Sequence, residues 1–210
     1  EEEWSAIEQG FDSIRHNLPQ LQRINVCGPA PLGVGHIIGK MWDRRHAQGG
    51  CGLRSYNATT KMVWVTYSQD YELKTSGYDP RTAQFVHLQS DVPPGLTDPL
   101  LFLVPQSKEV GYRRDVDAWN KDNGKRMVLT ARIADPIVDE AHAEQVLWEC
   151  VGLCRYLREK LPHRTPIHIV TAYALSLAPL FAFHLRTLAP IHFYDEVKQT
   201  HSYRLATVIP

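Results

Sequence analysis

An internal repeat constrains the fold of this 210-residue chain more than any other feature of its sequence. Residues 15–42 align without a gap on residues 158–185, and the predicted elements follow one another in the same order in both stretches. Five identities occur at this constant offset: Arg15/Arg158, Leu18/Leu161, Pro19/Pro162, Ile24/Ile167 and Leu32/Leu175. We therefore expect two copies of one structural unit.

Each copy opens with a predicted amphipathic helix. Apolar side chains recur at spacings of three and four over residues 4–18, and Pro19 ends the pattern. Residues 146–161 repeat this stripe and end at Pro162. A short apolar strand, a loop and a second apolar helix follow in both copies, so the repeat predicts a helix, a strand and a helix in each.

A further short strand closes each copy, "LRSYN" at residues 53–57 and "IHFYD" at residues 191–195. Alternating helices and strands are typical of a parallel sheet with helices on its faces. The sequence therefore predicts an α/β protein of two fused Rossmann-like units with mainly parallel sheets and flanking helices. We place unit one at residues 1–135 and unit two at residues 136–210.

The stretch "INVCGPAPLGVGHIIGKMW", residues 24–42, has the outline of a nucleotide-binding turn. It lacks both the Lys-Ser/Thr of a P-loop and the Gly spacing of a dinucleotide fingerprint. Ligands of parallel sheets bind at the carboxyl ends of strands, beside helix N-termini, and Gly33 would allow a close approach there. "TAYALS", residues 171–176, is its counterpart. Two similar cradles suit a ligand with two similar halves; alternatively, both loops are only tight turns.

The composition is that of a globular protein, with 43% hydrophobic residues. Lys plus Arg and Asp plus Glu number 23 each, so direct binding to DNA or RNA polymers is not expected. The sequence has neither an apolar run long enough for a membrane helix nor a basic signal peptide, which predicts a cytoplasmic protein without membrane contact. Because the chain begins without Met, we expect a processed protein or a piece of a longer one.

The cysteines are predicted to be buried free thiols. Cys27 lies in a predicted strand, and Cys150 and Cys154 lie four residues apart on a predicted helix. This spacing fits core packing better than a metal or redox pair, and no other metal-ligand spacing stands out. We expect neither a metal ion nor another cofactor.

At "INVCGPAPLGVGHIIGK", "PIHIVTAYALSLAPLFAFHLRTLAPIHFYD" and the closing strand "SYRLATVIP", the chain resembles a SAVED domain. SAVED domains are sensor modules of bacterial CBASS antiphage systems and consist of two fused CARF-like Rossmann units. The resemblance covers most of the chain. The loop "TAYALS" departs from it, since such domains often have a Pro-containing loop there.

The resemblance implies a receptor for a cyclic oligonucleotide second messenger. SAVED domains are normally fused to an effector such as a nuclease, a TIR NADase or a protease, which ligand-driven assembly switches on. No effector motif occurs in this sequence, so the effector, for which a nuclease is favoured, is expected in an N-terminal part of a longer protein. Two related units in one chain also predict head-to-tail self-association when the ligand binds.

A sensor of this kind needs flat surfaces for bases. Tyr56, Tyr173 and Tyr194 fall at or near predicted strand ends, where a ring can stack on a base, although core packing is an equal alternative for each. Asn57 and Asp195 follow two of these rings and are candidates for contacts with base edges or ribose hydroxyls.

Cations are needed for the phosphates. Arg54, Lys108 and Arg132 belong to predicted strands or strand ends, where a charge requires a partner. Lys108 is the weakest candidate, because the charged run at residues 107–126 is predicted to be a solvated loop. The wider segment 76–125 is expected to contain one strand, "PLLFLVP", between long loops.

We favour a cyclic dinucleotide of the cGAMP type, because two related cradles match two nucleotides, with a cyclic trinucleotide as the close alternative. The predicted ligand-binding residues are Gly28, Pro29, Ala30, Pro31, Leu32, Arg54, Tyr56, Asn57, Lys108, Arg132, Thr171, Ala172, Tyr173, Ala174, Leu175, Tyr194 and Asp195.

We expect no catalytic residues. The ten histidines form no HExxH motif, and the triplet His163-Arg164-Thr165 lacks the second copy that a two-histidine phosphoesterase requires. His168 and His192 fall within predicted strands, as core or edge histidines do. The alternative from another class is a phosphodiesterase, a ring nuclease that degrades a cyclic oligonucleotide.

Overall fold

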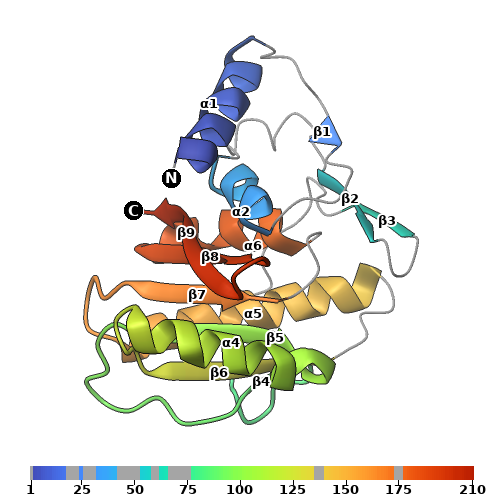
Figure 1. Ribbon diagram of the computed structural model, residues 1–210. Coiled ribbons are helices and arrows are strands. Elements are labelled where there is room, and N and C mark those ends of the chain that lie inside the picture. Colours follow the sequence, from blue (N-terminus) through green and yellow to red (C-terminus); the bar gives the residue numbers. More distant parts are fainter. Residues whose placement is uncertain are drawn as a thin grey trace.

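The chain is described by a computed structural model (Figure 1). The described residues are 2–17, 24–25, 32–41, 53–57, 62–65, 77–134, 140–172 and 177–210. The helices are α1 (Glu2–Asn17), α2 (Leu32–Met41), α4 (Glu109–Asp122), α5 (Glu140–Lys160) and α6 (Ala178–Leu185), with short 3-10 helices η1 (Gln106–Lys108) and η3 (Arg186–Leu188). The strands are β1 (Ile24–Asn25), β2 (Leu53–Asn57), β3 (Met62–Val65), β4 (Val86–Leu88), β5 (Leu100–Pro105), β6 (Val128–Ile133), β7 (Ile167–Thr171), β8 (Ile191–Val197) and β9 (Ser202–Ile209).

Six strands form one sheet in the order β4-β6-β5-β7-β8-β9. The four inner strands β6, β5, β7 and β8 run parallel to one another, and the edge strands β4 and β9 pair antiparallel with β6 and β8. A smaller sheet, β1-β2-β3, has one parallel and one antiparallel pair. The predicted α/β class with a mainly parallel sheet is therefore confirmed.

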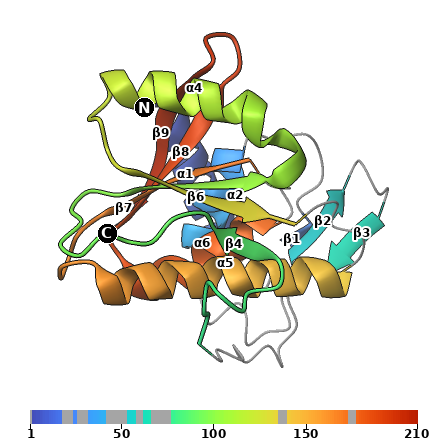
Figure 2. The ribbon, with the colours of Figure 1, turned by 90° about the horizontal axis from the view of Figure 1, so that it is seen from below.

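Helices cover both faces of the six-stranded sheet (Figure 2). On one face, alternate residues such as Leu101, Leu103 and Ile169 are fully buried in the core that contains α5 and α6. On the other face, Phe102 and Val170 pack with Trp119 of α4 in a second core. Because the inner strands are buried on both faces, they read in the sequence as continuous apolar runs.

Helices α1 and α2 pack at the end of the sheet that is formed by β8 and β9 (Figure 1). A small core of Trp4, Ile37 and Ala206 joins α1 and α2 to β9. A Cβ atom on Gly33 would lie 2.8 Å from both the Ala206 Cβ and the Trp4 ring. The absence of a side chain at Gly33 therefore serves the packing of α2, whereas the sequence had suggested it for ligand approach.

The second helices of the two repeat copies, α2 and α6, pack against one another. Gly39 of α2 lies so close to α6 that a Cβ atom there would be 1.9 Å from the Pro179 carbonyl oxygen and 2.9 Å from the Ala182 Cβ. The two repeat copies thus meet through their corresponding helices, each of which follows a predicted ligand loop.

The elements predicted from the repeat are present in both copies. Helices α1 and α5 end at Asn17 and Lys160, just before the two prolines, and β2 and β8 contain the predicted closing strands. The division into units at residue 135 stays a prediction. Strands β4, β5 and β6 precede residue 135 and β7, β8 and β9 follow it, and all six belong to one sheet.

The charged run at residues 107–126 is not a solvated loop, so this prediction was wrong. Most of it forms α4, which buries Val116, Trp119 and Asn120 against the sheet. These residues follow Tyr112 at helical spacings of four, seven and eight, a narrow stripe that the surrounding charges obscure. The segment 76–125 therefore contains a helix as well as strands β4 and β5.

Cys150 and Cys154 are buried free thiols in α5, as predicted, and burial raises the pKa of both. Cys27 and Cys51 lie outside the described residues. Within the described part of the chain, the helices are all too short or too polar to cross a membrane.

Candidate functional site

The carboxyl ends of the four parallel strands meet at one edge of the six-stranded sheet. Strand β5 is followed there by η1 and α4, β6 by α5, and β7 by α6, so three helices begin at this edge. Backbone N–H groups at helix N-termini attract anions, which makes this edge the natural place for a phosphate-bearing ligand.

Thr171, the last residue of β7, lies at this edge. Its side chain is buried, and its hydroxyl Oγ1 has no hydrogen-bond partner among the residues that the structure describes. The following residue, Ala172, donates its backbone N–H to the Leu103 carbonyl oxygen at 2.9 Å, which extends the pairing with β5. A buried hydroxyl without a partner costs about 1–3 kcal/mol, which a ligand can offset by a hydrogen bond.

Asp195 lies beside the first turn of α2. Its buried carboxylate accepts a hydrogen bond from the Gly33 backbone N–H, and one from the N–H of Glu196. Burial raises the pKa of Asp195, and the two N–H groups oppose this effect. The residue is thus engaged at a helix N-terminus, where a negative charge is stabilised, and the base contact that the sequence suggested is not needed to explain it.

Thr171 and Asp195 are brought together by the register of β7 and β8. The pair Val170↔Tyr194 places them one position further along two neighbouring strands, on the same face of the sheet. Because Asp195 accepts a hydrogen bond from the Gly33 N–H, the first turn of α2 lies beside these two residues. On this face of the sheet edge, Thr171 of the second repeat copy therefore lies close to the start of α2, which belongs to the first copy.

The two predicted cations that the structure describes with their side chains lie on the opposite, α4-covered side. Arg132 of β6 pairs with Glu109, the first residue of α4. Lys108 is exposed directly before Glu109, at the N-terminus of α4. The charge of Arg132 is thus partly compensated within the protein, whereas Lys108 is exposed to solvent.

Tyr194 also faces α4 and not the Thr171 side. Its ring centroid lies 4.9 Å from that of Trp119, and its hydroxyl lies 2.9 Å from His168 Nδ1. The half-buried ring is therefore engaged by internal contacts, in agreement with the core-packing alternative, and alternation along β8 separates it from Asp195.

His168 connects Tyr194 to a charged group near the start of β7. Its Nε2 lies 2.6 Å from Asp98 Oδ1, and Asp98 also pairs with Arg126 at 3.1 Å. Burial, and then the charge of Arg126, lowers the pKa of His168 to about 4, although Asp98 opposes the shift. His192 lies opposite His168 in the register, and burial and then the charge of Arg126 lower its pKa as well. His168 is buried and His192 is half-buried, and both lie within strands of the sheet, which agrees with the prediction of core or edge histidines.

We expect stability to fall with acidification because of His36 and His168. Burial lowers the pKa of His36, whose ring stacks on Phe193, to about 3. Between pH 6.5 and these values the unfolded chain binds protons that the folded chain does not, so each histidine removes up to about 1.4 kcal/mol of stability per pH unit. Urea unfolding at pH 7 and pH 5 measures this loss, which His168→Gln should reduce; equal loss in that variant contradicts the assignment.

Several predicted ligand residues fall outside the described side chains. Residues 28–31 and 173–176 are not described, and they include Gly28, Pro29, Ala30, Pro31, Tyr173, Ala174 and Leu175. Only the backbone of Leu32, Arg54, Tyr56 and Asn57 is placed, at the start of α2 and along β2. Their roles stay predictions.

The sequence did not identify Trp119, Asp98 or the cap on α2 as parts of this region. Trp119 belongs to the helix that was read as a loop, and a stripe search through residues 107–126 finds it. The contact between Asp195 and Gly33 joins residues far apart in the chain, and no local pattern signals it.

The chain was compared with known proteins. No protein-family model matches its sequence, and no curated protein does. Among solved structures, the Cap4 SAVED/CARF-domain receptor of Acinetobacter baumannii with the cyclic trinucleotide 2'3'3'-cAAA matches 96% of this chain with a TM-score of 0.70 at 13% identity. The same receptor with 3'3'3'-cAAA has a TM-score of 0.62 over 90% of the chain at 15% identity. Cap4 of Moraxella osloensis reaches 0.59 over 90% at 13% identity.

This chain spans about two fifths of the length of those receptors, 41%, 39% and 37% respectively. At these identities the likeness shows a shared fold. It extends over 90% or more of this chain.

Proposed function

We propose that this chain, which has the fold of SAVED/CARF-domain receptors, binds a cyclic oligonucleotide second messenger. The observation that carries this proposal is the buried Thr171 hydroxyl, which has no partner among the described residues and lies at the carboxyl edge of the parallel strands, beside the starts of α2 and α6. A phosphate or ribose oxygen at this edge would satisfy that hydroxyl and receive N–H groups from the helix N-termini. The solved receptors of this fold with cyclic trinucleotides support the ligand class.

Two ring sizes fit the proposal. Two related cradles favour a cyclic dinucleotide of the cGAMP type, whereas the structural neighbours contain cyclic trinucleotides. The pairing of α2 with α6 supports two related cradles, because each helix follows one predicted ligand loop. Both ring sizes therefore belong in the first binding experiment.

The proposal extends to the setting of the domain. As part of a longer protein, the chain would be the sensor of a fused effector, a nuclease being favoured, in bacterial antiphage defence. Ligand-driven head-to-tail assembly of the sensor would activate the effector. The fraction of the neighbours that the chain spans, about two fifths, leaves room for a further domain in proteins of that kind.

A panel of cyclic di- and trinucleotides in a thermal-shift assay tests the ligand class. A ligand at a hundred times its dissociation constant adds about 2.7 kcal/mol, or roughly 5–10 °C for a domain of this size. Light scattering after size exclusion, with and without the ligand that shifts the melting temperature, then measures assembly. Chromatography of the same mixtures detects linear products, which would support the phosphodiesterase alternative.

Thr171→Val provides the sharpest test of the site. Removing a buried hydroxyl that has no hydrogen-bond partner in the described part of the chain should leave the ligand-free protein equally stable or up to about 1 kcal/mol more stable. Ligand affinity should fall about 10–100-fold, since a hydrogen bond to a charged phosphate is lost. Isothermal titration calorimetry and urea unfolding measure the two quantities.

Thr130→Val is the matched control, because Thr130 is a buried β6 residue whose Oγ1 accepts a hydrogen bond from Arg113 at 2.6 Å. This change should cost about 1 kcal/mol of stability and leave the affinity unchanged. If Thr171→Val binds the ligand as tightly as the unmodified protein, the Thr171 edge is not the site.

A further inference from the structure

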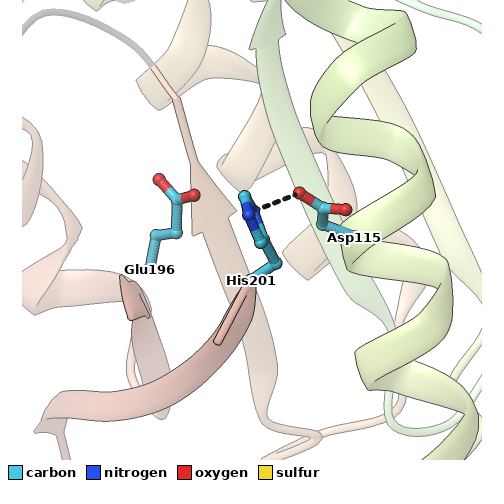
Figure 3. A group of neighbouring side chains, drawn as sticks. All are labelled: Asp115, Glu196 and His201. Atoms are coloured by element: carbon cyan, nitrogen blue, oxygen red, sulfur yellow. Dashed lines mark hydrogen bonds and ion pairs between the residues drawn. The ribbon is translucent and has the colours of Figure 1, made fainter. Parts of the chain in front are cut away.

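Three side chains with metal-binding atoms converge on the α4 side of the β8–β9 hairpin. Asp115 extends from α4, Glu196 lies near the end of β8, and His201 lies in the turn before β9 (Figure 3). One ligand atom from each lies within 4.8 Å of the others. The three residues are distant in sequence, which explains why their spacing does not predict a metal site.

The geometry of the group suits a small cation. His201 Nδ1 lies 3.2 Å from Asp115 Oδ2. Two ligands at about 2.0–2.1 Å from a tetrahedral zinc ion lie about 3.3 Å apart, so this pair already has the required separation. Glu196 lies on the other side of the imidazole in Figure 3, with a carboxylate oxygen within 4.8 Å of the ligand atoms of the other two residues.

The charges of the group are poorly balanced without a cation. The Asp115 side chain is only 13% exposed, and its other ion-pair partner, Arg114, is 3.4 Å away with a side chain that is 82% exposed. The half-buried Glu196 carboxylate has no ion pair or hydrogen bond among the described residues. Two neighbouring carboxylates with so little compensation favour the binding of a positive ion.

A second, independent observation comes from Tyr203. This residue pairs with Glu196 across β8 and β9 and is 6% exposed, yet its hydroxyl has no hydrogen-bond partner among the described residues. Tyr203 lies directly opposite Glu196 in the antiparallel pair, so the two side chains share a face of the sheet, and its ring centroid lies 5.6 Å from that of Trp119 in α4, the helix that carries Asp115. A buried hydroxyl that has no partner among the described residues, on the face where two carboxylates and an imidazole converge, points to an absent group there.

We propose that Asp115, Glu196 and His201 bind a divalent transition-metal ion of the Zn²⁺ class. An imidazole nitrogen and two carboxylate oxygens are suitable ligands for Zn²⁺, whereas Mg²⁺ and Ca²⁺ prefer oxygen ligands alone. Three protein ligands leave the fourth tetrahedral position to a water molecule. The Tyr203 hydroxyl donates a hydrogen bond to that water or to a ligating carboxylate, as outer-shell groups of metal sites do.

Such an ion would link α4 to the β8–β9 hairpin. Helix α4 precedes residue 135 and the β8–β9 hairpin follows it. Strand β8 also carries Asp195, which contacts the first turn of α2. The ion would therefore fix the position of β8 relative to α4. This inference does not depend on the identity of the cyclic oligonucleotide.

The test uses the full chain after treatment with a chelator. Calorimetric titration with Zn²⁺ should show one equivalent of binding, and Co²⁺ should give the visible absorption of a tetrahedral site. Asp115→Asn, Glu196→Gln and His201→Asn should each weaken Zn²⁺ binding at least about tenfold, and Tyr203→Phe about 10–100-fold if it acts on a ligating group. Asn is chosen at position 201 because it tolerates the positive φ of 48° found there.

His163→Asn is the matched control, since His163 is an exposed histidine outside the group. It should bind Zn²⁺ as the unmodified protein does. Melting curves without metal show whether each variant is folded. If a carboxylate variant does not fold, His201→Asn still tests the proposal, because His201 is exposed and its replacement is mild. Absence of a saturable single site, or equal Zn²⁺ binding in the His201→Asn and His163→Asn variants, overturns the proposal.

Discussion

Replacing Gly39 by Ala should lower the free energy of unfolding by about 3 kcal/mol. The new Cβ atom would lie 1.9 Å from the Pro179 carbonyl oxygen, which is backbone and cannot rotate away. Helix α2 would have to move off α6, and overpacking of this kind costs about 1–3 kcal/mol, occasionally more. Ala is the better helix former by about 1 kcal/mol, so the close contact itself costs about 1 kcal/mol more than the net loss that urea unfolding measures.

Gly10→Ala is the control for Gly39→Ala. Gly10 lies in α1, and a Cβ atom there would meet nothing within 4 Å. The same substitution should therefore stabilise the protein by about 0.5–1 kcal/mol. If both variants are stabilised equally, α2 and α6 do not pack as the structure describes, and the argument for two adjacent cradles loses its basis.

The elements of the repeat could be predicted because their signals are local. Pro19 and Pro162 end α1 and α5, and the apolar stripes that precede them have the helical period. The inner strands were found as apolar runs for the same reason. Helix α4 was not found, because its buried face is carried by few residues, Val116, Trp119 and Asn120, within a charged run. A narrow stripe of this kind gains its stability from tertiary packing more than from the sequence around it.

The candidate site could be predicted only at the level of the sheet edge. Placing Thr171 at the carboxyl end of a parallel strand follows from the order of elements, and the structure adds that its hydroxyl is buried without a described partner. Which face each residue points to depends on register. Tyr194 and Asp195, predicted together, lie on opposite faces because neighbours in a strand alternate. The group of Asp115, Glu196 and His201 exists only in the folded chain.

Glu149 has the other large expected effect, since one carboxylate holds the edge strand β4 in place. It accepts hydrogen bonds from the backbone N–H groups of Gln84, Phe85 and Val86 at 2.8, 2.7 and 2.7 Å. These residues lie more than sixty positions away in sequence, so the contact joins α5 to the start of β4. Hydrogen bonds to a charged acceptor are short and contribute about 1.5–3 kcal/mol each, although such contributions do not add fully.

Glu149→Ala should therefore reduce the free energy of unfolding by about 3–5 kcal/mol, because three backbone donors lose their acceptor. Glu149→Gln should cost less, since the amide keeps one oxygen that accepts while its NH₂ group faces donors.

Glu144→Ala on the same helix is the matched control, because the exposed Glu144 carboxylate has a weak 3.4 Å contact with Trp148 Nε1. This control should change stability by less than about 0.5 kcal/mol. Equal losses in the alanine variants at 144 and 149 would show that helix α5 itself, and not the anchoring of β4, had been weakened. Hydrogen exchange at Phe85 and Val86 separates these outcomes: loss of the anchor opens β4 locally, while the parallel strands β5 and β7 keep their protection.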